Sequence, residues 1–455
     1  MVSVLTTIAL IVIAVLLFEL IIFCHEFGHF ITAKKSGVLV NEFALGMGPK
    51  IFGFKKGETQ YSLRLFPIGG YCAMEGEDED SENPRAFNNA KVWKRMIIII
   101  AGAVMNILLG FIMMFAIVVQ SPEYAGTTVD GFSELSFSAH SGLMKGDKIT
   151  KLNDYSIWNS RDLSFAVATT DWKEVDGTTV EIFKEDCALN LCGLYGEFAN
   201  DKDKKYTKSQ LSEVYTILKK GCYEISRTSS KDDAMDVMEH YFAEMNNILG
   251  IKKYKVPEIE ERKTRKRYVA DVEVERNGKT VFLKDVQFYT YLESKDAEKP
   301  SVAIDFYVDS IPKNFGTVLE QTGSQTVSTV RMVWSSLIGM VQGKFSLKDI
   351  SGPVGITSAI TQVASDGLKT SFLDAFNNIL VMMMLITVNL GIVNMLPFPA
   401  LDGGRFVFLI IEAVFHKPIP RKVERIVNGV GLGILLLFIL LITLKDIWQL
   451  LPFGG

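Results

Sequence analysis

Four long apolar runs constrain this chain more than any other feature of its sequence. Residues 3–24 carry one charged side chain, Glu19, and the runs at 96–119, 375–396 and 426–444 carry none. A helix needs about 20 apolar residues to cross a bilayer, so each run is long enough. The sequence therefore predicts an α-helical polytopic membrane protein with transmembrane helices at 1–33, 96–119, 375–396 and 426–445. For the fourth, a buried helix or a hairpin with residues 406–415 is the alternative.

Basic side chains predict the orientation of these helices, because short cytoplasmic loops are enriched in Lys and Arg. The two connections that follow the first and third runs carry most of the basic residues near the membrane: Lys34, Lys35, Lys50, Lys55, Lys56, Arg64, Arg85, Lys91, Lys94, Arg95, and Arg405, Lys417, Arg421, Lys422, Arg425. Both connections are expected to face the cytoplasm. Both termini and residues 120–374 are then expected on the other side.

Composition excludes several classes of protein. A hydrophobic fraction of 48% and a charged fraction of 22% do not describe a disordered chain. The net charge of −4 gives no reason to expect a nucleic-acid partner. Five scattered cysteines are too few for a disulfide scaffold or a Cys-rich zinc module.

The strongest motif is His25-Glu26-Phe27-Gly28-His29, an H-E-x-x-H sequence inside the first apolar run. Its spacing puts both imidazoles on one helix face, where they can bind one zinc ion. Ionisable residues within a membrane helix are costly and usually functional. Lys34 follows His25 by about 13 Å of helix, which puts the motif nearer the cytoplasmic face. The alternative is three polar side chains that neighbouring helices merely satisfy.

A catalytic zinc ion needs a third protein ligand and an open position for water. Asp402, in the segment 394–404, is the candidate, because two prolines end the third helix there and two glycines allow a tight turn. The alternative is a loop aspartate that caps the next helix. Glu19 lies about 9 Å along the helix from His25 and is interpreted as lining a polar cavity or bonding a neighbouring helix. The remaining histidines fall in predicted soluble parts: His140, His240 and His416.

Together these motifs resemble the site-2 protease family of intramembrane zinc metalloproteases. The closest branch is the bacterial one with a PDZ domain between the second and third spans, the regulator of sigma-E protease type. The similarity covers nearly the whole chain in the same order. It rests on HEFGH at 25–29 and NMLPFPALDGG at 394–404, with weaker matches at 66–71, 101–106 and 352–356.

The resemblance implies roles for particular residues. His25, His29 and Asp402 would be the zinc ligands, and Glu26 would be the general base that takes a proton from zinc-bound water. Asn394 would help to hold the substrate. An asparagine at a proline break could equally satisfy the free carbonyls of its helix.

The cytoplasmic connection 34–95 contains a predicted β-hairpin, with alternating residues at 50–54 and 60–65 around Lys56-Gly57-Glu58. The resemblance implies a sheet-like element that dips into the membrane beside the zinc. Its edge could pair with an unwound substrate by β-augmentation. A plain surface hairpin is the alternative.

Residues 120–289 are expected to form a soluble PDZ-like α+β domain. Residues 138–149 resemble the PDZ signature of this branch, and Arg276-Asn277-Gly278-Lys279 predicts a hairpin turn. A helical insertion is expected at about 184–266. Its cysteines could form one disulfide, Cys187 to Cys192 or either one to Cys222.

Two segments complete the expected organisation. Residues 290–374 are expected to be a linker whose apolar positions between Val327 and Val341 recur at helical spacing. That helix could lie at the membrane surface, cover the protease core or simply pack. Residues 397–425 are expected to hold the LDG loop and a short helix.

By resemblance, the chain is expected to be an intramembrane zinc endopeptidase in a bacterial plasma membrane. It would cut single-span membrane proteins after another protease has trimmed them. Anti-sigma factors, signal-peptide remnants and pheromone precursors all fit as substrates. The PDZ-like domain would be a size filter, a substrate binder or a spacer. A receptor or adaptor with a structural metal is the alternative; a zinc transporter would need further ligands along the spans.

Overall fold

The computed structural model describes residues 4–77, 79–133, 136–176, 179–199, 206–251, 255–256, 259, 266–291, 301–344 and 350–450. The chain forms two compact units. Unit 1 comprises Met1–Pro122 and Asn314–Gly455, and unit 2 comprises Glu123–Lys313.

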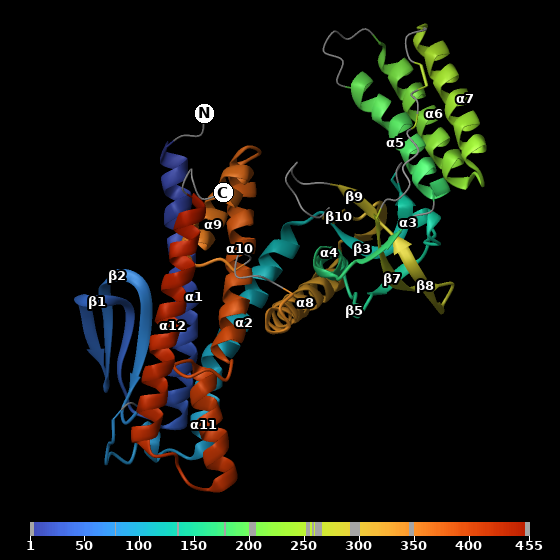
Figure 1. Ribbon diagram of the computed structural model, residues 1–455. Helices are drawn as coiled ribbons and strands as arrows, with labels where there is room; N and C mark the ends of the chain where they lie inside the picture. The colour runs from blue at the N-terminus through green and yellow to red at the C-terminus, as the bar shows by residue number, and fades with distance from the viewer. Residues whose placement is uncertain are drawn as a thin grey trace. The chain divides into compact units, whose positions relative to one another are not determined.

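Four helices of unit 1 are long and apolar enough to cross a membrane, which confirms the prediction of four such segments. They are α1 (Val4–Ser36), α2 (Val92–Gln120), α10 (Phe372–Asn394) and α12 (Arg421–Leu450). The separate helix α11 (Asp402–Phe415) precedes α12, so residues 406–415 do not form part of the fourth span. Figure 1 shows α1 ending, α2 beginning and α11 ending at the same end of unit 1.

Small residues bring α1, α2 and α10 close together, as is common between membrane helices. A Cβ atom on Gly28 of α1 would lie 2.4 Å from the carbonyl oxygen of Ala101 on α2. A Cβ atom on Gly110 of α2 would lie 2.5 Å from Val388 of α10. Side chains at either glycine would force the helices apart.

The hairpin expected around residues 56–58 is confirmed, but its strands are much longer than predicted. Strands β1 (Val40–Lys56) and β2 (Thr59–Met74) are both bent. Residues 42–45 pair with residues 60–63 and also with residues 70–73, while residues 50–56 pair with 59–64. Several apolar side chains of this sheet are exposed: Met47, Ile51, Phe52, Phe54, Leu65 and Phe66.

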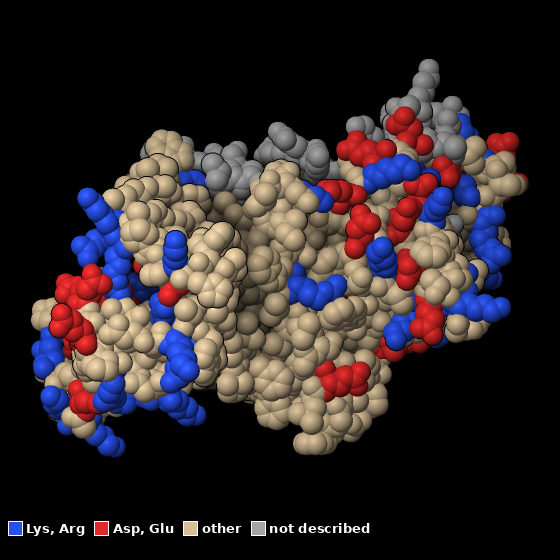
Figure 2. Space-filling model, turned by 90° about the horizontal axis from the view of Figure 1, so that it is seen from below, with Lys and Arg blue, Asp and Glu red and all other residues tan. Residues whose placement is uncertain are grey.

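Basic side chains surround the end of unit 1 that Figure 2 faces. Lys34 at the end of α1 binds Glu58 of the hairpin turn, with Nζ to Oε1 at 2.7 Å, and Arg85 binds the same carboxylate. The exposed basic residues near the ends of these elements are Lys55, Lys56, Arg85, Lys91, Lys417, Lys422 and Arg425.

Helix α8 (Phe315–Val341) packs on α2 and α10. Its polar side chains face the protein and its apolar side chains face outward, the opposite of a helix on a protein in water. The side chains it buries are mostly polar and small, and its large apolar side chains point outward. The hydroxyl of Thr322 donates a hydrogen bond to the carbonyl oxygen of Val318, and the hydroxyl of Thr326 donates one to that of Thr322, both at 2.7 Å. The buried residues include Gln321, Thr322, Thr326, Ser328 and Thr329; the exposed ones include Leu319, Val327, Trp334, Ile338 and Val341. A helix with this arrangement fits an apolar surrounding medium better than water.

Helix α9 (Pro353–Leu368) follows, and its N-terminus is bound by Asp446 of α12. The Asp446 carboxylate accepts hydrogen bonds from the backbone N–H groups of Gly352 and Gly355, both at 2.8 Å. A Cβ atom on Gly352 would lie 2.9 Å from that carboxylate. The glycines of the 352–356 motif therefore make room for a side chain that caps α9.

Unit 2 contains a mixed α and β core. Its sheet has the strand order β11-β3-β4-β7-β6, with β5 beside β4 and β8 beside β7. The strands are β3 (Glu123–Phe132), β4 (Lys148–Leu152), β5 (Tyr155–Ser156), β6 (Lys173–Asp176), β7 (Lys266–Arg276), β8 (Lys279–Gln287) and β11 (Phe306–Pro312). A smaller pair joins β9 (Tyr289–Tyr291) to β10 (Ser301–Ala303), and α3 (Phe137–His140) and α4 (Ser160–Thr169) complete the domain. Asn277 and Gly278 both have positive φ in the β7–β8 turn, as the sequence predicted.

One predicted boundary is wrong. Residues 301–313 belong to unit 2 and not to a linker, because β11 pairs with β3 and extends the sheet to Pro312. Three helices, α5 (Thr179–Ala199), α6 (Lys208–Arg227) and α7 (Lys231–Leu249), form the expected insertion, which begins at Thr179 rather than 184. Cys222 is disulfide-bonded and Cys187 is free, so the Cys187–Cys192 pairing is excluded; the Cys192 side chain is outside the described residues.

Candidate metal centre

Helix α1 presents His25 and His29 on one face, as the spacing predicts. Their Nε2 atoms lie 3.2 Å apart, and both residues are more than nine-tenths buried. The Nδ1 atom of His29 lies 2.8 Å from the carbonyl oxygen of Ile98 on α2. A carbonyl only accepts hydrogen bonds, so Nδ1 of His29 carries a proton, and the neutral ring would offer its Nε2 lone pair to a metal ion.

Asp402 reaches these histidines from the first turn of α11. Its Oδ2 atom lies 3.2 Å from Nε2 of His25 and 3.4 Å from Nε2 of His29. That oxygen is buried and has no hydrogen-bond partner among the described residues. The N-cap residue of α11 is Leu401. The alternative of Asp402 as the N-cap of this helix is therefore wrong.

The backbone break between α10 and α11 brings Asp402 to this position. Gly403 and Gly404 are needed for close approach, since Cβ atoms there would lie 2.2 Å from Leu396 O and 2.4 Å from Phe398 O. The left-handed residue of the turn is Ala400, with φ of 74°. Its N–H donates to Oδ1 of Asn428 on α12 at 3.3 Å.

The three atoms form a triangle with edges of 3.2, 3.2 and 3.4 Å. A tetrahedral zinc ion with ligand distances of about 2.0–2.1 Å has ligand-to-ligand edges of roughly 3.3–3.4 Å. His25, His29 and Asp402 also form the one group of metal-binding side chains found among the described residues. The donor set, its spacing and the convergence of the Asp402 oxygen on both Nε2 atoms all fit zinc.

Gly102 of α2 closes one side of the centre. A Cβ atom there would lie 2.4 Å from Nε2 of His29 and 2.7 Å from Cε1 of His25. Any larger residue would displace the imidazoles. This explains why a glycine occupies the 101–106 motif, a role that sequence reasoning did not assign.

Glu26 lies beside the triangle and against β2. The backbone N–H of Cys72 is a hydrogen-bond partner of its carboxylate, which also interacts electrostatically with His25, His29 and Asp402. A Cβ atom on Gly70 would lie 3.6 Å from Cγ of Glu26. Strand β2 therefore supports this carboxylate from the side.

Two asparagines border His25. Nδ2 of Asn394, the last residue of α10, lies 3.4 Å from Nε2 of His25, on the metal side of the ring. The side-chain amide of Asn106 on α2 lies 3.3 Å from Nδ1 on the opposite side. Sequence reasoning missed Asn106, although it is a polar residue in the middle of an apolar run.

The other candidates lie elsewhere. Glu19 is 8% exposed, and neither carboxylate oxygen has a hydrogen-bond partner among the described residues. His240 is exposed on α7 and pairs with Glu244 at 3.7 Å, and His416 is exposed at the end of α11. The side chain of His140 is outside the described residues.

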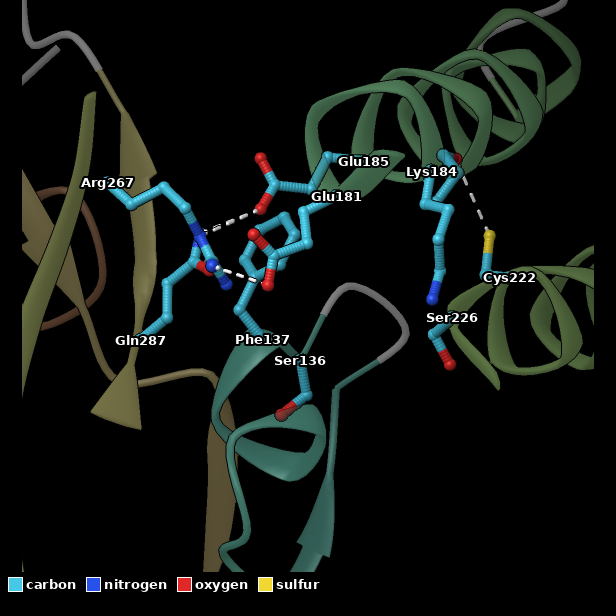
Figure 3. A pocket seen from close by; sticks show the side chains of 10 residues that line it. Ser136, Phe137, Glu181, Lys184, Glu185, Cys222, Ser226, Arg267 and Gln287 are labelled. Atoms are coloured by element: carbon cyan, nitrogen blue, oxygen red, sulfur yellow. Dashed lines mark hydrogen bonds and ion pairs between the residues drawn. The ribbon is translucent and has the colours of Figure 1, made fainter. Parts of the chain in front are cut away.

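Apart from the candidate metal centre, a cavity of about 150 Å³ lies within unit 2 between α5 and the sheet (Figure 3). Arg267 binds Glu181 at 3.0 Å and Glu185 at 3.6 Å, and Gln287 donates to Glu185 at 3.0 Å. Lys184 donates to the carbonyl of Thr228 at 2.6 Å. The charged and polar groups that line the cavity thus form hydrogen bonds and ion pairs within the protein. We interpret the cavity as a polar contact between the helical insertion and the sheet.

Two histidines and an aspartate converging among apolar helices, beside a glutamate, define the class of this protein as a membrane metalloenzyme. Residues 13–438 match the family profile described as Peptidase family M50. The chain belongs to this family, the site-2 proteases, and is a zinc metalloprotease.

Relatives extend along almost the whole chain. A Clostridium acetobutylicum protein, provisionally named a zinc metalloprotease, is 31% identical over 96% of this chain and 97% of its own length. The regulator of sigma-W protease RasP of Bacillus subtilis is 29% identical, over 96% of this chain and 97% of its own. The zinc metalloprotease RasP of Bacillus licheniformis is also 29% identical, over 96% and 98%. Family membership favours a protease over the receptor and transporter alternatives.

Proposed function

We propose that this protein is an intramembrane endopeptidase whose zinc ion is held by His25, His29 and Asp402, with Glu26 as general base. The observation that carries this proposal is the triangle of ligand atoms, with edges of 3.2 to 3.4 Å, within an apolar helix bundle. Three protein ligands leave a position open for water and substrate.

Each neighbouring residue has a task in hydrolysis. His25, His29 and Asp402 would hold a zinc ion, which would supply Lewis acidity toward a bound water and the scissile carbonyl. Glu26 takes the proton from the attacking water and passes it to the leaving amine, which is general acid–base catalysis. Asn394 can donate a hydrogen bond to the substrate backbone from the metal side of His25.

The β1–β2 sheet supports a role in binding extended substrate. A transmembrane substrate arrives as a helix, and its peptide bonds must be exposed before hydrolysis. Residues 50–56 pair on one side only within the described sheet, and apolar side chains such as Phe52 and Phe54 are exposed there. An unwound segment could pair with this edge inside the membrane.

The proposed orientation puts the basic end of unit 1 in the cytoplasm and unit 2 on the other side of a bacterial plasma membrane. The disulfide at Cys222 supports this, because disulfides persist in oxidising compartments. Unit 2 would be the PDZ-like domain, acting as a size filter or a substrate binder. Deleting unit 2, residues 123–313, should then admit untrimmed substrates.

The proposed substrates are single-span membrane proteins already trimmed by another protease. A relative named regulator of sigma-W protease supports the anti-sigma-factor class for this chain. Signal-peptide remnants are the second candidate class. Both offer one membrane helix with little attached on the outer side.

The test is cleavage of a trimmed single-span substrate in liposomes by the wild type and by Glu26→Gln, with bound zinc measured in both. We expect the variant to keep its zinc and lose about 10²–10⁴-fold in rate. Glu19→Gln, on the same helix, is the matched control and should keep most activity. Equal rates for wild type and Glu26→Gln would refute the role of Glu26.

A further inference from the structure

The two proposed histidine ligands need the same tautomeric state before they can bind zinc through Nε2. Each must carry its proton on Nδ1, so that the Nε2 lone pair points at the metal. Such histidines usually donate their Nδ1–H to a fixed acceptor nearby. For His29 the acceptor is the carbonyl oxygen of Ile98, at 2.8 Å.

The corresponding neighbour of His25 is Asn106, whose side-chain amide lies 3.3 Å from Nδ1. With Nδ2 toward the ring, Nδ1 must accept and Nε2 must carry the proton, which suits a hydrogen bond to Asp402 but not a metal ion. In that orientation Oδ1 of Asn106 is buried with no hydrogen-bond partner among the described residues. A half-turn of the amide brings Oδ1 to the Nδ1–H and frees Nε2.

We propose that Asn106 is a positioning residue of the zinc centre, whose Oδ1 accepts the Nδ1–H of His25 when the metal is bound. This inference rests on the proposed ligand set. Asn106 itself would not touch the metal or the substrate. It would determine which nitrogen of His25 is free, as the carbonyl of Ile98 does for His29.

The surroundings of Asn106 fix the position of its backbone and Cβ atom. The residue is fully buried in α2. Oγ1 of Thr387 on α10 donates to its backbone carbonyl at 3.2 Å, and a Cβ atom on Gly391 would lie 3.3 Å from its Cβ. The amide can turn about its own bond, but the side chain has little room to move away from His25.

The experiment measures zinc affinity of the full-length protein in detergent, by competition with a chelator, together with the visible spectrum of the cobalt-substituted protein. Asn106→Leu has similar volume and no acceptor, and should bind zinc about 10–100-fold more weakly, with an altered cobalt spectrum. Asn106→Asp keeps an acceptor and loses the Nδ2 donor, so it should stay within a few-fold of wild type. Thr357→Val removes a hydroxyl on α9 that bonds the carbonyl of Pro353 at 2.7 Å, and it should change neither measurement.

Two results would overturn the inference. One is wild-type zinc affinity in Asn106→Leu, and the other is an Asn106→Asp variant as weak as Asn106→Leu. If Asn106→Leu does not fold, the zinc affinity of Asn106→Asp tests the inference by itself. Only a role of residue 106 as hydrogen-bond acceptor predicts tight zinc binding by the aspartate variant. His25→Ala separates this inference from the proposed function: retained zinc affinity in that variant would refute the ligand set itself.

Discussion

Arg95 at the start of α2 and Glu412 near the end of α11 form a two-bond ion pair that is largely shielded from solvent. Nη1 of Arg95 lies 3.0 Å from Oε2 of Glu412, and Nη2 bonds the other carboxylate oxygen. The side chains are only 11% and 15% exposed. The pair ties the helix that begins with Asp402 to the helix that carries Gly102.

Breaking this pair on one side should destabilise unit 1. Arg95→Met or Glu412→Met leaves one charge buried without its partner, which typically costs about 3–5 kcal/mol. The double variant should recover much of that loss. Thermal unfolding in detergent measures the effect.

Lys173→Met in the exposed Lys173–Asp285 pair is the control and should leave the midpoint of unfolding unchanged. Single variants as stable as the wild type would show that the Arg95–Glu412 pair does not hold α11.

Removing Asp402 should release zinc without unfolding the protein. The Oδ2 atom of Asp402 lies 3.2 Å from Nε2 of His25 and 3.4 Å from Nε2 of His29, so the contacts that Asp402→Ala removes from that atom lie within the metal centre. We expect the zinc content after dialysis against a chelator to fall from near one ion per chain to near zero. The metal-free variant should unfold near the midpoint of the metal-free wild type, because loss of the ion itself lowers the midpoint.

Asp366→Ala on α9 is the matched control, because the Asp366 carboxylate is exposed and pairs with the exposed Lys369 at 2.6 Å. Full zinc retention in Asp402→Ala would remove this residue from the ligand set.

The outward face of α8 should contact lipid. Trp334 on that face is 45% exposed, and Trp158 in unit 2 is 57% exposed. In variants that keep one of these tryptophans, lipids brominated on their acyl chains should quench Trp334 strongly, whereas aqueous iodide should quench Trp158. Iodide quenching of Trp334 equal to that of Trp158 would mean that α8 lies in water.

Unit 2 should become more stable as the pH falls from 7 toward 4. Asp305 is 3% exposed, and burial raises the pKa of its carboxyl from 3.8 to about 6. Its carboxylate accepts the backbone N–H of Ser138 at 3.0 Å, which offsets part of this shift. Between those two values the folded state binds a proton that the unfolded state has released, so protonation favours folding.

The shift corresponds to at most about 3 kcal/mol, at 1.36 kcal/mol for each unit. Hydrogen exchange of the β3 and β11 amides, corrected for intrinsic rates, should report greater protection near pH 4.5 than at pH 7. Asp305→Asn should lose this dependence. A variant with the same pH dependence as the wild type would assign the effect to another group.

The local features of this protein follow directly from its sequence. The apolar runs predict four membrane helices because backbone groups in lipid must bond within their own helix. The H-E-x-x-H spacing puts His25 and His29 on one face because the helix repeats every 3.6 residues. Asn277 and Gly278 predict a hairpin because their residue types tolerate positive φ. Each of these inferences depends on neighbours in the chain.

The resemblance to a known family supplied what local pattern could not. Asp402 lies far from His29 in sequence, and no periodicity connects them. The prolines and glycines around it made it a candidate third ligand, and the same motif in site-2 proteases, where it accompanies H-E-x-x-H, strengthened that assignment. The sequence predicted that Asp402 is a zinc ligand. The distance of 3.2 Å between its Oδ2 atom and Nε2 of His25 is a property of the folded chain.

Only the tertiary structure decided which distant residues meet. The pairing of β11 with β3 draws residues 306–312 into the sheet of unit 2, although sequence reasoning ended that domain at 289. The position of Asn106 behind His25 depends on how α1, α2 and α10 pack. The sequence by itself determined the helices, the turns and the helix face of the histidines, since short-range geometry governs them. Long-range contacts depend instead on the summed packing of many side chains, which no single segment encodes.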